Sequence, residues 1–206
     1  ITDDEWAKVI ERFGLKNPAV VFFSVDKEKV VNATLAGMRM KVAGDLDMID
    51  HDKLNFLWVT DFPLLEYHEE DKRYYAVHHP FTAPLPDQES MFDNLTPETA
   101  GKMKAQAYDI VLNGVEIGGG SIRIADPEVQ AKIFRTIGMS DEEAKMKFSF
   151  LLDALQFGAP PHGGLALGLD RVMMLLLKRN SIREVIAFPK TQKGQCLMSD
   201  APSPVV

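Results

Sequence analysis

Residues 108–123 read YDIVLNGVEIGGGSIR, a pattern that predicts two strands joined by a tight turn. Asn113 and Gly114 separate two alternating apolar segments, and both residue types accept the positive φ angles that a two-residue hairpin loop requires. This turn fixes the register of the hairpin. Since side chains alternate along a strand, Asp109 and Glu116 are expected on the same face of the sheet, as diagonal neighbours on the two strands.

These two carboxylates predict a cation site. Diagonal neighbours lie about 7–8 Å apart at the backbone, so two negative charges there repel one another unless a cation lies between them. Mg²⁺ typically binds one or two carboxylates together with substrate phosphates. We therefore expect Asp109 and Glu116 to hold Mg²⁺ beside a phosphorylated ligand. The alternative is a surface hairpin whose charges are solvated.

The position of Arg123 depends on whether the second strand contains a bulge. The step from Glu116 to Arg123 is an odd number of positions, so strict alternation places the two side chains on opposite faces. Gly118, Gly119 and Gly120 lie between them, and glycines inside a strand often mark a bulge or the close approach of another backbone. We expect one extra residue in this run to bring Arg123 to the side of the carboxylates. Side chains on opposite faces would disprove this hypothesis.

The composition indicates a globular protein. The chain has 206 residues, of which 46% are hydrophobic, and this is enough for a real core in one large domain or in a domain with a small appendage. It has no apolar run of membrane-spanning length, no leader that resembles a signal peptide, and Cys196 as its single cysteine. We therefore expect a cytoplasmic protein with no membrane partner and no internal disulfide. The net charge of −7 argues against broad, sequence-independent binding to nucleic acid.

Residues 1–50 are predicted to form a small α/β unit. A capping box at Thr2 begins a helix that ends at Gly14. The apolar residues 19–25 predict a strand, and a helix is expected over residues 26–43.

From residue 51 the pattern changes to strands and turns, followed by capped helices. Besides the hairpin, strands are predicted at 56–61, 74–78, 165–167 and 184–188, and helices after Asp126, after Ser140 and over 168–178. Hairpins and irregular loops, rather than regular helical crossovers, connect the strands. The expected fold class is therefore α+β, an antiparallel sheet with flanking helices on one side.

A second block, GGLALGLDR at residues 163–171, predicts a nucleotide-binding element. Its glycines flank a short strand, so a nucleotide could lie against bare backbone. Arg171 stands in the first turn of the following helix, where its guanidinium could form two hydrogen bonds with phosphate oxygens. No Gly-Lys-Ser/Thr sequence follows the glycines, so the block is not a P-loop. Taken alone, such a block more often serves simple packing.

The pair His78-His79 is a third candidate. One imidazole could serve as a hydrogen-bonding or proton-handling group near neutral pH. Because adjacent strand residues point to opposite faces, we expect one of the two histidines to be structural.

Taken together, these blocks resemble the class II aminoacyl-tRNA synthetases, and in detail the aspartyl-tRNA synthetases of bacterial type. The resemblance rests on FLWVTDFP at 56–63, HHPFT at 78–82, NGVEIGGGSIRI at 113–124, GAPPHGG at 158–164, GLDR at 168–171 and VIAFPKT at 185–191. It covers nearly the whole chain. Residues 1–50 resemble the end of the insertion domain that interrupts the bacterial-type catalytic domain, and residues 51–206 resemble the C-terminal half of that catalytic domain.

The resemblance implies a role for each candidate residue. Glu116 would contact ATP and its Mg²⁺, with Asp109 as the second carboxylate on the ion. Arg123 would receive the side-chain carboxylate of aspartate, together with His78 and Gly119. The other implied ATP-binding residues form the GLDR segment, namely Gly168, Leu169, Asp170 and Arg171, with Arg171 on the γ-phosphate. Arg171 and Glu116 are thus the implied catalytic residues.

The implied reaction joins aspartate to ATP, giving aspartyl-adenylate and pyrophosphate, and then transfers aspartate to tRNA. In such an in-line displacement at the α-phosphate, positioning and charge neutralisation supply most of the acceleration. The family's anticodon-binding domain, its first, dimer-forming motif and its second motif, with the arginine that holds the α-phosphate, have no counterpart in the sequence. The sequence therefore resembles a C-terminal fragment of an enzyme that is a homodimer when complete and that binds tRNA mainly through domains outside this sequence.

Little or no aminoacylation is expected from these residues alone, and measurable ATP–pyrophosphate exchange by the 206-residue chain would contradict that expectation. Two other functions are compatible with the same fold. One is a non-catalytic, synthetase-like module that binds ATP, an amino acid or a protein partner, although Asp109, Glu116, Arg123 and Arg171 are all retained. The other is a ligase for lysine or asparagine, but the HHPF segment and Arg123 favour aspartate.

Overall fold

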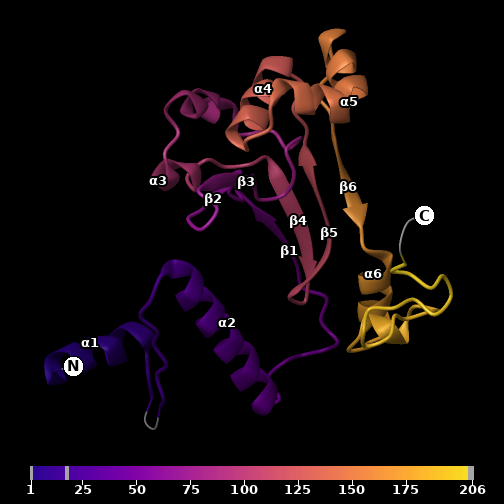
Figure 1. The fold of residues 1–206 in the computed structure, drawn as a ribbon. Helices are drawn as coiled ribbons and strands as arrows, with labels where there is room; N and C mark the ends of the chain where they lie inside the picture. The colour runs from indigo at the N-terminus through magenta and orange to yellow at the C-terminus, as the bar shows by residue number, and fades with distance from the viewer. Residues whose placement is uncertain (1, 17–18, 204–206) are drawn as a thin grey trace. The chain divides into compact units, whose positions relative to one another are not determined.

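A computed structural model describes residues 2–16 and 19–203 (Figure 1). The chain divides into two compact units, Ile1–Asp52 and Lys53–Val206. Among the described residues, no helix combines the length and the apolar character needed to cross a membrane.

The first unit contains two helices, α1 (Asp3–Phe13) and α2 (Glu28–Asp45). The predicted capping box is confirmed, because the Thr2 hydroxyl accepts a hydrogen bond from the Glu5 amide and the Glu5 carboxylate accepts one from the Thr2 amide. Gly14 ends α1 with a left-handed φ of 57°, which glycine adopts without steric cost. Both predicted helices of this unit are therefore present.

The strand predicted at residues 19–25 is wrong, since this segment has no regular structure. A strand needs a hydrogen-bonded neighbour to be stable. Helices, and no strand, accompany the segment within the described part of its unit. Its large apolar side chains are consequently exposed, as they are at Val20, Phe22, Phe23 and Val25.

The second unit is built on a four-stranded antiparallel sheet (Figure 1). Its strands are β1 (Phe56–Thr60), β4 (Ala107–Leu112), β5 (Val115–Ile122) and β6 (Gly163–Leu167), which lie in the order β1-β4-β5-β6. The predicted α+β class, an antiparallel sheet flanked by helices, is confirmed.

Shorter elements connect these strands. A two-stranded sheet pairs β2 (Leu65–His68) with β3 (Arg73–Ala76). The helices are α3 (Pro97–Ala100), α4 (Pro127–Thr136), α5 (Asp141–Gln156) and α6 (Leu169–Leu176), with 3-10 turns at Pro86–Asn94 and Ile182–Glu184. The predicted caps are confirmed, since the Asp126 side chain accepts hydrogen bonds at the start of α4 and Ser140 does so at the start of α5.

The strand predicted at residues 184–188 is also wrong. The 3-10 turn Ile182–Glu184 occupies the start of this segment, and Val185 follows it in a helical conformation. The Ser181 hydroxyl accepts a hydrogen bond from the Arg183 amide. Local side-chain to backbone bonds of this kind compete with strand pairing, which explains why an apolar, β-branched run remains outside the sheet here.

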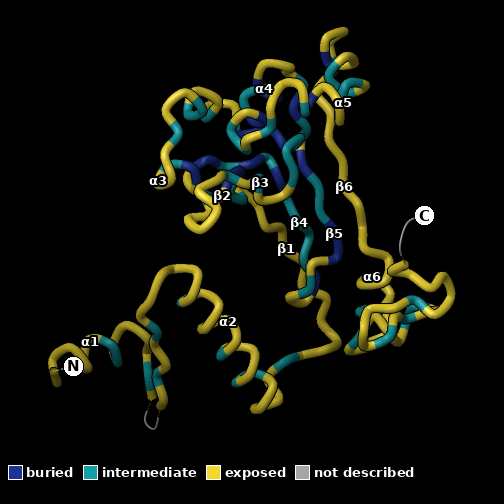
Figure 2. The backbone as a smooth tube through the Cα atoms, viewed as in Figure 1, coloured by how far each residue is buried: buried dark blue, intermediate teal, exposed yellow. Residues whose placement is uncertain are grey.

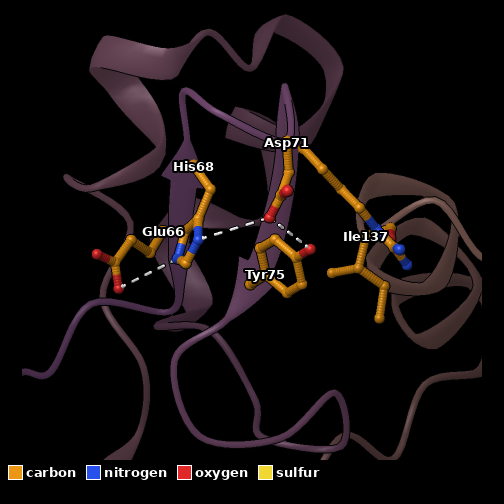
Figure 3. A network of polar contacts seen from close by, with 6 residues as sticks. Glu66, His68, Asp71, Tyr75 and Ile137 are labelled. Carbon is orange, nitrogen blue, oxygen red and sulfur yellow. Dashed lines mark hydrogen bonds and ion pairs between the residues drawn. The ribbon is translucent and has the colours of Figure 1, made fainter.

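The β2–β3 hairpin is attached to the end of α4 (Figure 3). Within the hairpin, Asp71 accepts a hydrogen bond of 3.0 Å from the Tyr75 hydroxyl, and His68 lies 3.9 Å from the same carboxylate. Arg73 donates from Nε to the carbonyl oxygen of Ile137, which caps α4, at 2.7 Å. A cation at a helix C-terminus is favourable, so this contact fixes β3 relative to α4.

The hydrophobic core lies between the β2–β3 hairpin, the central strands and α4 (Figure 2). Its buried members are Leu64, Leu65, Ala83, Ala100, Met103, Ala105, Ala107, Ile124, Val129 and Ile133. Beside it, the ring of Phe81 packs edge-on against the rings of Phe134 and Phe148, with centroid distances of 6.0 and 5.2 Å. Edge-to-face packing of this kind stabilises the segment that carries Phe81.

The outer strands of the large sheet are exposed along their whole length (Figure 2). Trp58 on β1 is 56% exposed and Leu167 on β6 is 59% exposed. The apolar side chains of these two strands therefore contribute little to the core of this unit.

Candidate active site

A cavity of about 560 Å³ joins the segment after β3 to strands β4, β5 and β6 and to the first turn of α6. This volume is typical of sites for small molecules. The predicted site residues that line it are His78, Asp109, Glu116, Gly119, Arg123, Gly168, Asp170 and Arg171. Leu169 is the exception, because its side chain is 70% exposed and lies outside the lining. Residues from three separate parts of the sequence thus meet in one place.

The hairpin has the predicted turn and a bulge. Asn113 and Gly114 take φ angles of 50° and 80°, and Glu116 lies opposite Val111. Ile110, the residue before Val111 on β4, is paired with Gly118, so Ile117 is the extra residue on β5. The hypothesis of one additional residue before Arg123 is confirmed, although the bulge precedes the glycine run. As a result, Arg123 and Glu116 line the same cavity.

The three glycines of β5 permit close approach of neighbouring groups on both sides. A Cβ on Gly119 would overlap the carboxylate of Asp109, whereas a Cβ on Gly120 would overlap the carbonyl oxygen of Gly164 on β6. Both glycines thus serve packing against neighbouring strands and not the Asn113-Gly114 turn. The glycine run therefore lets the Asp109 side chain lie across β5 and lets β6 pair closely with it.

Asp109 and Glu116 repel one another in the absence of a cation. Burial raises the pKa of Asp109 above its usual value, and the negative charge of Glu116 raises it further, while His78 has the opposite effect. Both causes disfavour a charged Asp109, and a bound cation would oppose them. The described residues contain no cluster of three metal-ligating side chains. An ion held by this pair would take its other ligands from a bound phosphate or water, as Mg²⁺ commonly does.

Arg171 reaches the carboxylate pair from the first turn of α6. Its Nη1 donates to the backbone oxygen of Glu116 at 2.9 Å and lies 3.4 Å from the Glu116 carboxylate oxygen Oε1. Both side chains are about half exposed, so water screens this attraction and it contributes little to stability. The guanidinium is oriented at the mouth of the cavity, where it can bind an anionic ligand such as phosphate.

Arg123 is held on two sides at the other end of the cavity. Its Nη1 donates to the Ser121 hydroxyl at 2.7 Å and contacts Nε2 of His79. The Phe81 amide donates to Nδ1 of the same imidazole at 3.2 Å, which assigns the ring proton to Nε2. Arg123 and His79 therefore present two N–H donors to each other. A carboxylate placed beside both groups would accept from each of them.

A family model for tRNA synthetases class II (D, K and N) matches residues 5–192. The chain belongs to this family. The aspartate–tRNA(Asp/Asn) ligase of Desulfatibacillum aliphaticivorans is 52% identical over 204 residues, which make up 99% of this chain and 34% of that protein. The aspartate–tRNA ligase of Macrococcus caseolyticus (strain JCSC5402) is 56% identical over 186 residues, 90% of this chain and 31% of that protein. The resemblance to aspartyl-tRNA synthetases is thereby confirmed.

The solved structure of an aspartyl-tRNA synthetase from Entamoeba histolytica supports the fold. It aligns with a TM-score of 0.51 at 23% identity, covering 94% of this chain and 32% of its own. The class II synthetase chain described here thus spans about a third of the length of the relatives that it matches.

Two further residues lie against Arg123 in this synthetase chain: Ser121, which the sequence did not single out, and His79, which it named in the histidine pair without assigning it a role in binding. The expectation that only one histidine of the pair can face a ligand is wrong, since His78 and His79 both line the cavity. The reason is that β3 ends at Ala76, so strand alternation does not apply to the irregular segment that follows. The two-residue spacing of Ser121 and Arg123, which places both on one face of an extended segment, was the available signal for Ser121.

Proposed function

We propose that this chain carries the aspartate-binding and phosphate-binding side of the active site of an aspartate–tRNA ligase. Such an enzyme joins aspartate to ATP, giving aspartyl-adenylate and pyrophosphate, and then transfers aspartate to tRNA. The proposal is supported by one observation above all. A single cavity has a guanidinium at each end, Arg123 and Arg171, with the carboxylates of Asp109 and Glu116 between them.

The amino acid is proposed to bind at the Arg123 end. A carboxylate side chain placed there accepts hydrogen bonds from the Arg123 guanidinium and from Nε2 of His79. Gly119 keeps this part of β5 free of a side chain, and His78 completes the wall. A neutral amide ligand would direct an NH₂ group at two donors, so asparagine is expected to be disfavoured by several kcal/mol, of the order found when polar groups are left unpaired.

The nucleotide is proposed to bind at the α6 end. Arg171 would hold the γ-phosphate, and Gly168 and Asp170 border the same space. Leu169 would act only through its backbone, because its side chain lies outside the cavity. Asp109 and Glu116 fit the requirements of Mg²⁺, which when bound would neutralise phosphate charge. No side chain is assigned as a general acid or base, since orientation and charge neutralisation suffice for displacement at the α-phosphate.

The remaining assignments follow from the family. Residues 1–50 are proposed to be the end of an insertion domain and residues 51–206 the C-terminal half of the catalytic domain. The boundary of the two compact units, which falls in the sequence between Asp52 and Lys53, supports this division. For the whole enzyme we propose tRNA and L-aspartate as partners, a homodimeric state and a cytoplasmic location.

Binding of Mg·ATP tests this proposal directly. We expect the 206-residue chain to show saturable chemical-shift changes with Mg·ATP, a readout that detects even millimolar affinity. Arg171→Ala should weaken this binding on the order of tenfold, because a charge-assisted pair with phosphate is lost at a half-exposed position. Arg179→Ala, which removes an exposed arginine outside the cavity, is the matched control and should bind as the unchanged chain does. Absence of saturable binding, or equal weakening in both variants, would contradict the proposal.

A further inference from the structure

Gln130 on α4 is a buried amide that the proposed function does not use. It is 1% exposed, and its Nε2 donates to the carbonyl oxygen of Pro80 at 2.8 Å. A buried amide is costly unless it is paired, so this bond fixes the geometry between helix and carbonyl. Pro80 directly follows His79, which contacts Arg123.

Helix α4 holds the segment around the two histidines at three points. Before them, Arg73 donates to the carbonyl oxygen of Ile137 at the end of the helix. After them, the ring of Phe81 packs edge-on against Phe134 of α4. The bond from Gln130 lies between these two contacts in the sequence of the segment. The histidine pair thus has no regular secondary structure of its own but is attached to a rigid helix.

The bond from Gln130 also affects the orientation of the His79 ring. Nδ1 of His79 accepts from the amide of Phe81, and that amide belongs to the same peptide group as the Pro80 carbonyl. A rotation of this planar peptide would move the carbonyl away from Gln130 and the N–H away from the imidazole together. The Gln130 amide therefore acts on the His79 ring through the rigid peptide group between Pro80 and Phe81.

We propose that Gln130 is a positioning residue for recognition of the aspartate side chain. By holding the peptide between Pro80 and Phe81, it keeps the His79 imidazole turned so that Nε2 and the Arg123 guanidinium converge on one carboxylate. This inference rests on the proposed function for its ligand. The placement of the ring by Gln130 is a separate claim that needs no ligand.

The experiment compares Gln130→Met, which keeps side-chain length but removes the donor, with Ile133→Val on the same helix and equally buried. The His79 ring signals, assigned with His79→Gln, are followed by NMR through a pH titration of the full chain. In the unchanged chain, burial and the nearby charges of Arg123 and His78 lower the pKa of His79. In Q130M the His79 ring is expected to move away from these surroundings, so its pKa should rise toward the ordinary value. In I133V the His79 ring should titrate as it does in the unchanged chain. L-Aspartate affinity should fall roughly three- to tenfold in Q130M only, and Mg·ATP affinity should not change.

Each outcome separates the two claims. If His79 titrates identically in Q130M and I133V, the role of Gln130 is overturned. If the ring responds as expected but no variant binds L-aspartate, the proposed function fails and the placement by Gln130 stands. Gln130→Asn serves as a second variant should Q130M not fold, because it keeps a buried amide that is one methylene too short to reach Pro80, and it should reproduce the same changes in His79.

Discussion

Replacing Arg123 with leucine is expected to abolish detectable binding of L-aspartate to the 206-residue chain. The arginine is the cationic member of the donor pair at its end of the cavity, and its Nη1 is already oriented by the Ser121 hydroxyl. Removing it leaves a carboxylate ligand with one neutral donor, His79, in a partly desolvated place. We expect a loss of at least about a hundredfold in affinity, or about 2.8 kcal/mol at 1.4 kcal/mol per factor of ten. Titration with L-aspartate followed by NMR measures this affinity in the unchanged chain and in the variant.

Two controls show whether this loss reflects carboxylate recognition. Arg123→Lys keeps the charge but not the planar fork, so it should retain part of the affinity. Mg·ATP binding should be unchanged in the leucine variant, since Arg171 lies at the other end of the cavity. Equal affinity of the unchanged chain for L-aspartate and L-asparagine, or an undiminished affinity of the leucine variant, would show that Arg123 does not select an acidic side chain.

The sequence predicts the hairpin well because its determinants are local. Asn113 and Gly114 specify the turn, and alternation then specifies which side chains share a face. The position of the bulge is a different matter. Its extra residue is Ile117, which is 6% exposed, so burial of an apolar side chain decides where the additional residue lies. Three adjacent glycines indicate that a bulge is tolerated nearby but carry no information about that packing.

The histidine pair could not be placed from the sequence because its conformation depends on tertiary contacts. The segment is held by Gln130 and by Phe134, both on a helix that follows it by some fifty positions, and neither contact has a local signature. The strands wrongly predicted at 19–25 and 184–188 also depend on tertiary contacts that the local sequence does not reveal. Apolar, β-branched composition predicts a strand, but pairing requires a neighbour that composition does not supply.

Gly120→Ala should destabilise the second unit by about 3 kcal/mol or more. A Cβ at this position would overlap the carbonyl oxygen of Gly164, and it would also lie 3.1 Å from a ring carbon of Tyr108. The obstacle on β6 is backbone, so relief requires β5 and β6 to separate and to lose ladder hydrogen bonds. Overpacking costs about 1–3 kcal/mol and each lost bond about 1 kcal/mol, which together give the expected size.

Gly164→Ala provides a matched comparison in the adjoining strand, because a Cβ there would meet nothing within 4 Å. It should leave stability unchanged or raise it slightly, since glycine in a strand is entropically unfavourable. Urea unfolding followed through the fluorescence of Trp58, with Trp6 replaced by phenylalanine in every variant, reports on the second unit alone. A midpoint for G120A equal to that for G164A would mean that β6 does not pack against bare backbone of β5. The close pairing that aligns Arg171 with Glu116 across these strands would then need another cause.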